Sequence, residues 1–229
     1  MIIQIHNIYN SKCSYHRMET GKISDAMNWR CAIKKFDNKK KISKEDFEDI
    51  IESLRLAPSS FGLQPWKFIV IKDKKIREEL RKNSWDQAQI TDAEYLIVLC
   101  ARTDLDEDYV ERFIQSVADT RGTNTESLEN YKKMLLNPIK NLSKEELIEW
   151  SKKQVYIALG VLLTTTAEKK IDSCPMEGFD KKKFDEILKL NEKNLTATVL
   201  CPIGYRSNED KYADQKKFRF EKEEIFEFR

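Results

Sequence analysis

The sequence contains only two histidines, His6 and His16, and both lie near its start. A Ser-His-Asp triad, a Cys-His pair or a histidine-bound metal therefore cannot be built on the main part of the chain. Cysteine is also scarce: the chain has five, and no two of them form a Cys-x-x-Cys pair. This pattern excludes a zinc ribbon and a disulfide framework, and it is typical of a reducing, internal compartment. We expect no metal site.

Long apolar runs are missing as well. The longest one, from Tyr156 to Leu163, is much shorter than the roughly 20 residues that a membrane-spanning helix requires. Residues 1–10 place no basic segment ahead of an apolar run, so we expect no signal peptide. These observations predict a cytoplasmic protein that does not bind membranes.

Neither sign of charge dominates, because 41 Lys and Arg residues nearly balance 39 Asp and Glu residues, for a net charge of +2. Proteins that bind nucleic acids show a clear basic excess or a basic stripe, so we expect no nucleic-acid partner. The small numbers of glycines (6) and prolines (5) exclude collagen-like and low-complexity classes. A chain of 229 residues is long enough to bury a core without disulfides.

The hydrophobic pattern predicts helices that enclose a few strands, which is an α+β fold. Ser43 and Ser143 each begin a capping-box pattern ahead of a helical stripe, and Pro58 ends the first of these helices. We treat residues 1–20 as an extension of uncertain structure and residues 21–229 as one domain. The predicted helices are 23–29, 43–57, 73–82, 144–169, 180–190 and a helical stretch within 104–142 that ends at Pro138 and Asn141; the predicted strands are 67–71, 95–101 and 195–201.

Four short segments combine residues that suit ligand binding. Arg30 and Lys34 place two cations after the first helix; residues 57–66 offer two hydroxyls, a glycine and an amide. Residues 174–179 join a proline to a glycine, and residues 216–219 read Lys-Lys-Phe-Arg. Taken singly, each also fits a plain structural role, as a solvated basic helix end, a rigid turn, a surface turn or a solvated charge run.

Taken together and in this order, these segments resemble the nitroreductase family of FMN-dependent NAD(P)H oxidoreductases. The resemblance runs from about Ile23 to the C-terminus. It implies a central, mainly antiparallel or mixed sheet surrounded by helices, and an intertwined homodimer that exchanges its C-terminal strand and holds one FMN in each interface. The segments that carry it are PSSFGLQPW (58–66), KKQVYIALG (152–160), CPMEGFD (174–180), and CPIG (201–204) followed by KKFR (216–219).

The resemblance also implies which residues bind the phosphate end and the polar edge of FMN. Arg30, Lys217 and Arg219 correspond to the phosphate ligands, and Ala32 stands where many members have a serine. Lys34 corresponds to a lysine at the N1/O2 edge, where its charge favours the reduced flavin.

Further positions are implied around the flavin ring. Gly178 corresponds to the residue whose backbone N–H points at N5, and the negative charge of Asp86 would repel the O4 atom. The implied catalytic residues are Lys34, Glu177 and Gly178. The remaining implied contacts are Asp86 and Gln89 at the pyrimidine edge, Gln154 near the ribityl chain, Pro175, Met176 and Glu177 over the ring, and Pro58, Ser59, Ser60 and Gly62 reaching the flavin of the partner.

The implied activity is a ping-pong reaction in which NAD(P)H reduces the cofactor and a nitroaromatic or a quinone reoxidises it. Two alternatives remain open: another reductase of the flavin superfamily, acting on enoates or pteridines or destroying flavin, and a flavin-binding redox sensor with little turnover. The tail adds a separate prediction, because Phe218, Phe220, Phe226 and Phe228 alternate with charged residues. Such alternation predicts a strand, which would join the sheet edge of a second subunit.

Overall fold

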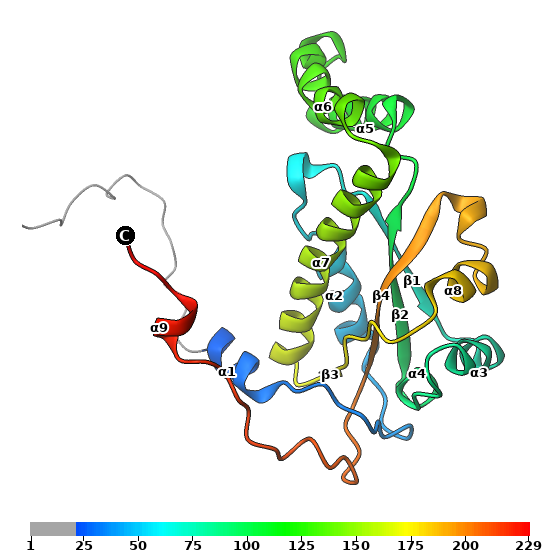
Figure 1. The fold of residues 1–229 in the computed structure, drawn as a ribbon, viewed down its shortest axis with the longest axis vertical. Helices are drawn as coiled ribbons and strands as arrows, with labels where there is room; N and C mark the ends of the chain where they lie inside the picture. Colours follow the sequence, from blue (N-terminus) through cyan, green and yellow to red (C-terminus); the bar gives the residue numbers. More distant parts are fainter. Residues whose placement is uncertain (1–21) are drawn as a thin grey trace, which may run out of the picture.

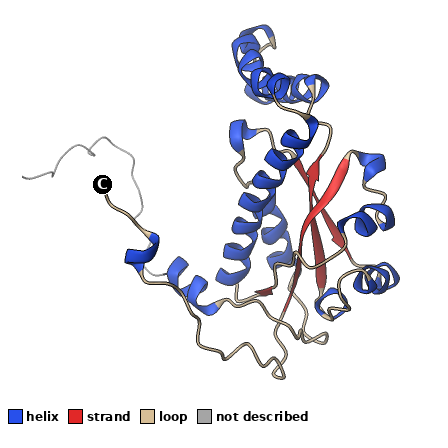
Figure 2. Ribbon diagram, in the orientation of Figure 1, coloured by secondary structure: helices blue, strands red, loops and turns tan. Residues whose placement is uncertain are grey.

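The computed structural model describes residues 22–229, so the predicted extension over 1–20 lies outside the described residues. Four strands form one sheet in the order β1-β2-β4-β3, in which every neighbouring pair is antiparallel. Helices lie on both faces of this sheet (Figures 1 and 2). The predicted α+β class with an antiparallel sheet is therefore confirmed. The strands are β1 (Trp66–Ile71), β2 (Tyr95–Arg102), β3 (Asp172–Ser173) and β4 (Leu195–Gly204).

Alternate residues of the central strands supply two separate hydrophobic cores. Ile97 and Leu99 of β2 pack with α2 (Lys44–Arg55) and the long helix α7 (Lys144–Glu168). Leu96 and Val98, which point to the opposite face, pack with the helices on the other side of the sheet. Those helices are α3 (Lys74–Lys82), α4 (Gln89–Asp92) and α8 (Lys181–Ile187), seen to the right of the sheet in Figure 1.

The helix starts follow from their capping residues. Ser143 accepts a hydrogen bond from the backbone N–H of Glu146, and the Glu146 carboxylate accepts one from the Ser143 N–H, which completes the predicted capping box. Ser43 likewise accepts from the Asp46 N–H at the start of α2. Local signals of this kind explain why the predicted starts of these two helices are confirmed.

Several predicted boundaries need correction. The stretch 104–142 forms two helices, α5 (Glu107–Arg121) and α6 (Glu129–Asn141), because Gly122 ends α5 in the left-handed conformation at φ 62°. Pro138 lies inside α6 instead of ending it, whereas Asn141 is its last residue. Helix α8 stops at Ile187, short of the predicted 190, and β4 continues past 201 to Gly204.

The C-terminal tail departs most from expectation. No strand forms within residues 216–229; instead Lys222–Ile225 is a short helix, α9, so a strand over this segment is wrong for the single chain. The tail leaves the body of the protein on the side of α1 (Lys22–Trp29), as Figure 1 shows. Its phenylalanines have little cover, with Phe218 70% and Phe228 94% exposed.

Candidate active site

Three predicted phosphate ligands gather at the C-terminal end of α1. The Lys217 ammonium donates to the backbone carbonyl oxygens of Asn28 and Arg30, at 2.9 and 2.6 Å, and also to that of Met27. Burial lowers the pKa of Lys217, and the nearby charges of Arg30 and Arg219 lower it further. We call Arg30, Lys217 and Arg219 the basic cluster. The fold therefore brings together cations that lie at opposite ends of the sequence.

The Arg30 side chain supplies the strongest sign of a ligand. Its Nε atom is buried and has no hydrogen-bond partner among the described residues. A buried donor without a partner costs roughly 1–3 kcal/mol, so such atoms are rare unless a ligand or water completes them. An anion beside three cations would accept this bond, and a phosphate group fits that description. The basic cluster therefore suits the phosphate end of FMN.

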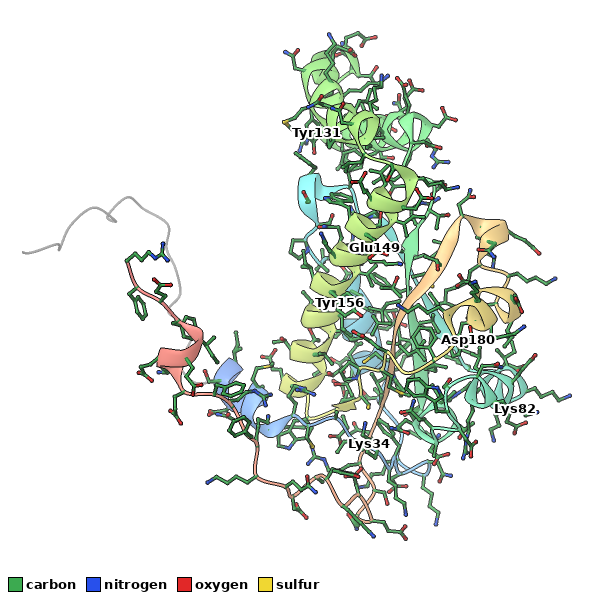
Figure 3. The ribbon with its side chains drawn as sticks, in the orientation of Figure 1. Lys34, Lys82, Tyr131, Glu149, Tyr156 and Asp180 are labelled. Atoms are coloured by element: carbon green, nitrogen blue, oxygen red, sulfur yellow. The ribbon has the colours of Figure 1, made fainter. Side chains whose placement is uncertain are left out.

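The segment after β3 lies directly beside residues 30–34. Ala32 forms a parallel bridge with Ser173, and Met176 forms an antiparallel bridge with Leu200 of β4. The Lys34 ammonium lies 3.8 Å from the Cys174 sulfur, at the lower end of the molecule in Figure 3. The Lys34 side chain and the backbone of Pro175 and Met176 therefore lie in one region, next to the basic cluster.

Gln89 joins the same region from α4. Its side chain is buried and lies beside the thiol of Cys174. Burial raises the pKa of Cys174, although Lys34 and Gln89 act in the opposite direction. Asp86, in contrast, is not buried: its side chain is 80% exposed and forms a salt bridge with Arg81 at 2.8 Å. Of the two residues expected at the pyrimidine edge, only Gln89 faces the segment around Cys174.

Asp210 positions Lys34, and no pattern in the sequence identified it. One of its carboxylate oxygens accepts the backbone N–H groups of Lys34 and Lys35, at 2.6 and 2.7 Å. Burial would raise the pKa of Asp210, but backbone N–H donors from residues 34, 35, 212 and 213 outweigh it, and the pKa is lowered. The contact joins residues 176 positions apart, which explains why local pattern does not reveal it.

Replacing Asp210 with asparagine should lower the melting temperature by roughly 3–10 °C at pH 7, because an amide accepts these bonds less well than a carboxylate. The lowered pKa makes this contribution complete above the unfolded value of about 3.9, and it disappears as the pH falls through the lower folded value. Melting curves of both proteins at pH 7 and pH 3 test this. A difference that persists unchanged at pH 3 would contradict it.

Glu177 and Tyr156 form a hydrogen-bonded pair beside this segment. The Tyr156 hydroxyl donates to the Glu177 carboxylate at 2.5 Å, and it extends from the middle of α7 (Figure 3). Burial raises the pKa of Tyr156, and the bond to Glu177 raises it further. The phenol therefore keeps its proton at neutral pH. Tyr156 lies inside the quoted KKQVYIALG motif, but nothing in its spacing marked it as a site residue.

The loop predicted to contact the flavin of a partner lies elsewhere in the chain. The backbone N–H of Ser60 donates to the Gln154 side chain at 2.9 Å, and Ser60–Gly62 forms a single 3-10 turn. Gln154 is buried under this loop. Residues two apart on a helix project in nearly opposite directions, so Gln154 faces away from the side of α7 that Tyr156 occupies. Pro58, Ser59, Ser60, Gly62 and Gln154 therefore form a second group, separate from the first.

Other kinds of site find no support in residues 22–229. No group of three His, Cys, Asp or Glu side chains lies close enough to hold a metal ion there, and both histidines precede this range. None of the helices in that range is long and apolar enough to cross a membrane. A surface cavity of about 520 Å³ beside Arg102 and Asn194 contains none of the predicted site residues.

Comparison with known proteins gives matches over most of the chain. A protein of Staphylococcus saprophyticus, "Putative NAD(P)H nitroreductase", is 38% identical over 197 residues, which cover 82% of this chain and 90% of that protein. The structure of the "putative nitroreductase ydfN" of Bacillus subtilis superposes with a TM-score of 0.81 at 18% identity, covering 91% of this chain and 99% of that one. A "putative nitroreductase in complex with FMN" of Exiguobacterium sibiricum superposes with a TM-score of 0.76 at 19% identity, covering 90% and 97%.

At such low identity the two superpositions describe the fold alone. The sequence match shows more than the fold, because the identity is 38% and the alignment covers most of both chains. In addition, the family model described as "Nitroreductase family" matches residues 27–205, which include the first site segment and the whole of the sheet. This chain therefore belongs to the nitroreductase family.

Proposed function

We propose that the protein is an FMN-dependent NAD(P)H oxidoreductase that reduces nitroaromatics, quinones or both. The buried, unpartnered Nε atom of Arg30 within the basic cluster carries this proposal, because it calls for an anion. The cluster lies beside residues 174–178, which the family likeness assigns to the flavin ring. A phosphate at one end and a flat ring at the other describe FMN better than they describe a free anion.

In this proposal FMN, when bound, supplies the reversible exchange of two electrons and a hydride. The chain supplies charge, position and protons. Arg30, Lys217 and Arg219 hold the phosphate, and Lys34 provides a positive charge near the polar edge of the ring. The Tyr156 hydroxyl keeps its own proton and donates a hydrogen bond to the Glu177 carboxylate, within the segment that ends at Gly178. Gly178 offers its backbone N–H as a hydrogen-bond donor.

The proposal includes a homodimer. Helix α7 exposes Tyr156 and Ile157, 40% and 44%, on a face where a side chain added to Gly160 would meet nothing within 4 Å. A glycine on an open helix face lets a second helix approach closely. The separation of Gln154 and residues 58–62 from the basic cluster supports the same arrangement, because a second copy could bring its loop to this site.

The absorption spectrum of the purified protein is the first test. We expect the flavin bands of a yellow protein, their bleaching by NADH or NADPH, and their return when a nitroaromatic or a quinone is added. A colourless protein that does not bind added FMN would overturn the proposal. Reoxidation by an enoate or a pteridine alone would favour another flavin reductase, and slow reduction by both nicotinamides would favour a redox sensor.

Lys34→Met should lower the reduction potential of the bound flavin by roughly 30 mV, equal to about 1.4 kcal/mol for two electrons, because it removes a charge that favours the reduced form. FMN should remain bound, and reduction by NAD(P)H should be slower. The matched control is Lys35→Met, since Lys35 is adjacent but pairs with Glu209 at 2.7 Å on the surface. Equal potentials in the two variants would place Lys34 away from the flavin.

A further inference from the structure

The turn between α3 and α4 has an unusual backbone. Trp85 and Asp86 both adopt a positive φ of 52°, in the left-handed region that side chains other than glycine rarely occupy. Two consecutive residues in this region store conformational strain, typically of the kind found at ligand sites and switches. Neither residue is a glycine, so the strain must be offset by contacts that the turn makes.

Those contacts join the turn to the segment that contains Gly178. The Gln87 side-chain amide donates to the Gly178 carbonyl at 2.9 Å, and the Asp180 N–H donates to the Asn83 carbonyl at 2.9 Å. Asp180, labelled in Figure 3, is the N-cap residue of α8 and follows this segment. On the other side, Arg81 holds the Asp86 carboxylate at 2.8 Å. Hydrogen bonds therefore hold the turn on both sides of Trp85, through Asn83 before it and through Asp86 and Gln87 after it.

The indole of Trp85 lies directly on Gly178. A Cβ atom added to Gly178 would stand 2.0 Å from Cζ3 of Trp85 and 2.5 Å from Cε3, so no larger residue fits without moving the ring. Yet Trp85 is 78% exposed, so most of its indole surface is open to solvent. A tryptophan held in a strained turn, with most of its ring exposed beside a candidate catalytic residue, is placed to contact a ligand.

We propose that Trp85 determines acceptor specificity, by stacking its exposed indole face on the flat ring of an aromatic oxidant next to Gly178. The inference rests on the proposed function and goes beyond it, because it names the residue that selects aromatic acceptors. An electron-rich indole favours electron-poor rings such as nitroaromatics and quinones in offset stacking. An acceptor without a flat conjugated ring gains nothing from this contact.

The first experiment tests the contact without any turnover. Gly178→Ala and Trp85→Ala are made singly and together, and the melting temperature of each purified protein is measured. Alanine at a position that tolerates it reduces the entropy of the unfolded chain and stabilises the protein. We therefore expect Gly178→Ala to raise the melting temperature in the Trp85→Ala background but not in the wild type. Equal shifts in both backgrounds would show that the two residues do not touch and would overturn the proposal.

The second experiment measures acceptor binding and use. Titration of 4-nitrobenzoate into the oxidised holoprotein, followed by calorimetry, should show affinity about tenfold weaker in Trp85→Ala and largely restored in Trp85→Phe. The KM for a quinone should rise by a similar factor, while the rate with ferricyanide, which has no ring, should not change. Met134→Ala removes another exposed apolar side chain, on α6, and serves as the control.

The outcomes separate this inference from the proposed function. Unchanged 4-nitrobenzoate affinity in Trp85→Ala, or equal losses for the quinone and ferricyanide, would overturn the role of Trp85 while leaving the oxidoreductase assignment intact. A wild-type protein that holds no FMN would overturn the proposed function and the acceptor specificity with it. Weakened 4-nitrobenzoate binding together with an absence of nicotinamide turnover would uphold the stacking contact and reject the proposed reaction.

Discussion

Arg30→Ala weakens FMN binding by about thirty- to a thousandfold, equal to roughly 2–4 kcal/mol, if the basic cluster holds the phosphate. The Arg30 Nε atom is buried and has no hydrogen-bond partner in the part of the chain that this structure describes, so a hydrogen bond to an anion would remove the cost of this unpaired donor. Flavin content after purification and titration of the apoprotein with FMN, followed by fluorescence, both measure the effect.

Arg219→Ala should act in the same direction, because Arg219 lowers the pKa of Lys217 from nearby and is itself exposed and available. Lys217→Ala should cost less affinity, since its ammonium is a single point charge and already binds the carbonyl oxygens at the end of α1. Arg55→Ala provides a control, because Arg55 is a surface arginine paired with Glu52. Full FMN content in both arginine variants of the basic cluster would reject the phosphate assignment.

Deleting residues 222–229 should convert the proposed dimer into a monomer and reduce its FMN content, although Lys217 and Arg219 remain. The deleted segment exposes Ile225, Phe226 and Phe228, by 58%, 58% and 94%, and apolar surface of this kind usually marks an interface. Light scattering of the purified proteins gives the mass, and the visible spectrum gives the flavin content.

A full-length variant distinguishes the loss of the phenylalanine contacts from the loss of the backbone segment itself. Phe226→Ser with Phe228→Ser keeps the backbone and removes the rings, so it should weaken the dimer in the same way. Glu223→Gln changes an exposed charge in α9 and should leave the mass unchanged. A truncated protein that remains dimeric and yellow would show that the tail is dispensable and that the interface lies elsewhere, for example on the open face of α7.

Local signals in the sequence account well for the helices and central strands. The stripe after Ser43, the capping box at Ser143 and the apolar run in β2 each depend on neighbouring residues, and each was predicted within a few positions. Gly122 was the missed local signal, because a glycine after a helical stripe marks a C-terminal cap. The tail forms the short helix α9 where the alternation of phenylalanines with charged residues predicts a strand, and pairing of such a strand with a second subunit stays a prediction.

Contacts between distant residues could not be derived from local pattern. Three such contacts depend on the tertiary fold, which brings distant segments together. They are the bridge between Ala32 and Ser173, the hydrogen bond from Lys34 to Asp210, and the contact of Trp85 with Gly178. The family likeness supplied the candidate list, and the structure adds Asp210, Tyr156 and Trp85 to it.

The order of protein synthesis has a consequence for cofactor loading. The Lys217 ammonium binds the Arg30 carbonyl across 187 residues of sequence, so one half of the basic cluster leaves the ribosome long before the other. At 5–20 residues per second, roughly 10–40 seconds separate the two. During that interval the nascent chain carries Arg30 without the other two cations of the basic cluster. If FMN binds at the basic cluster as proposed, its loading follows release of the finished chain.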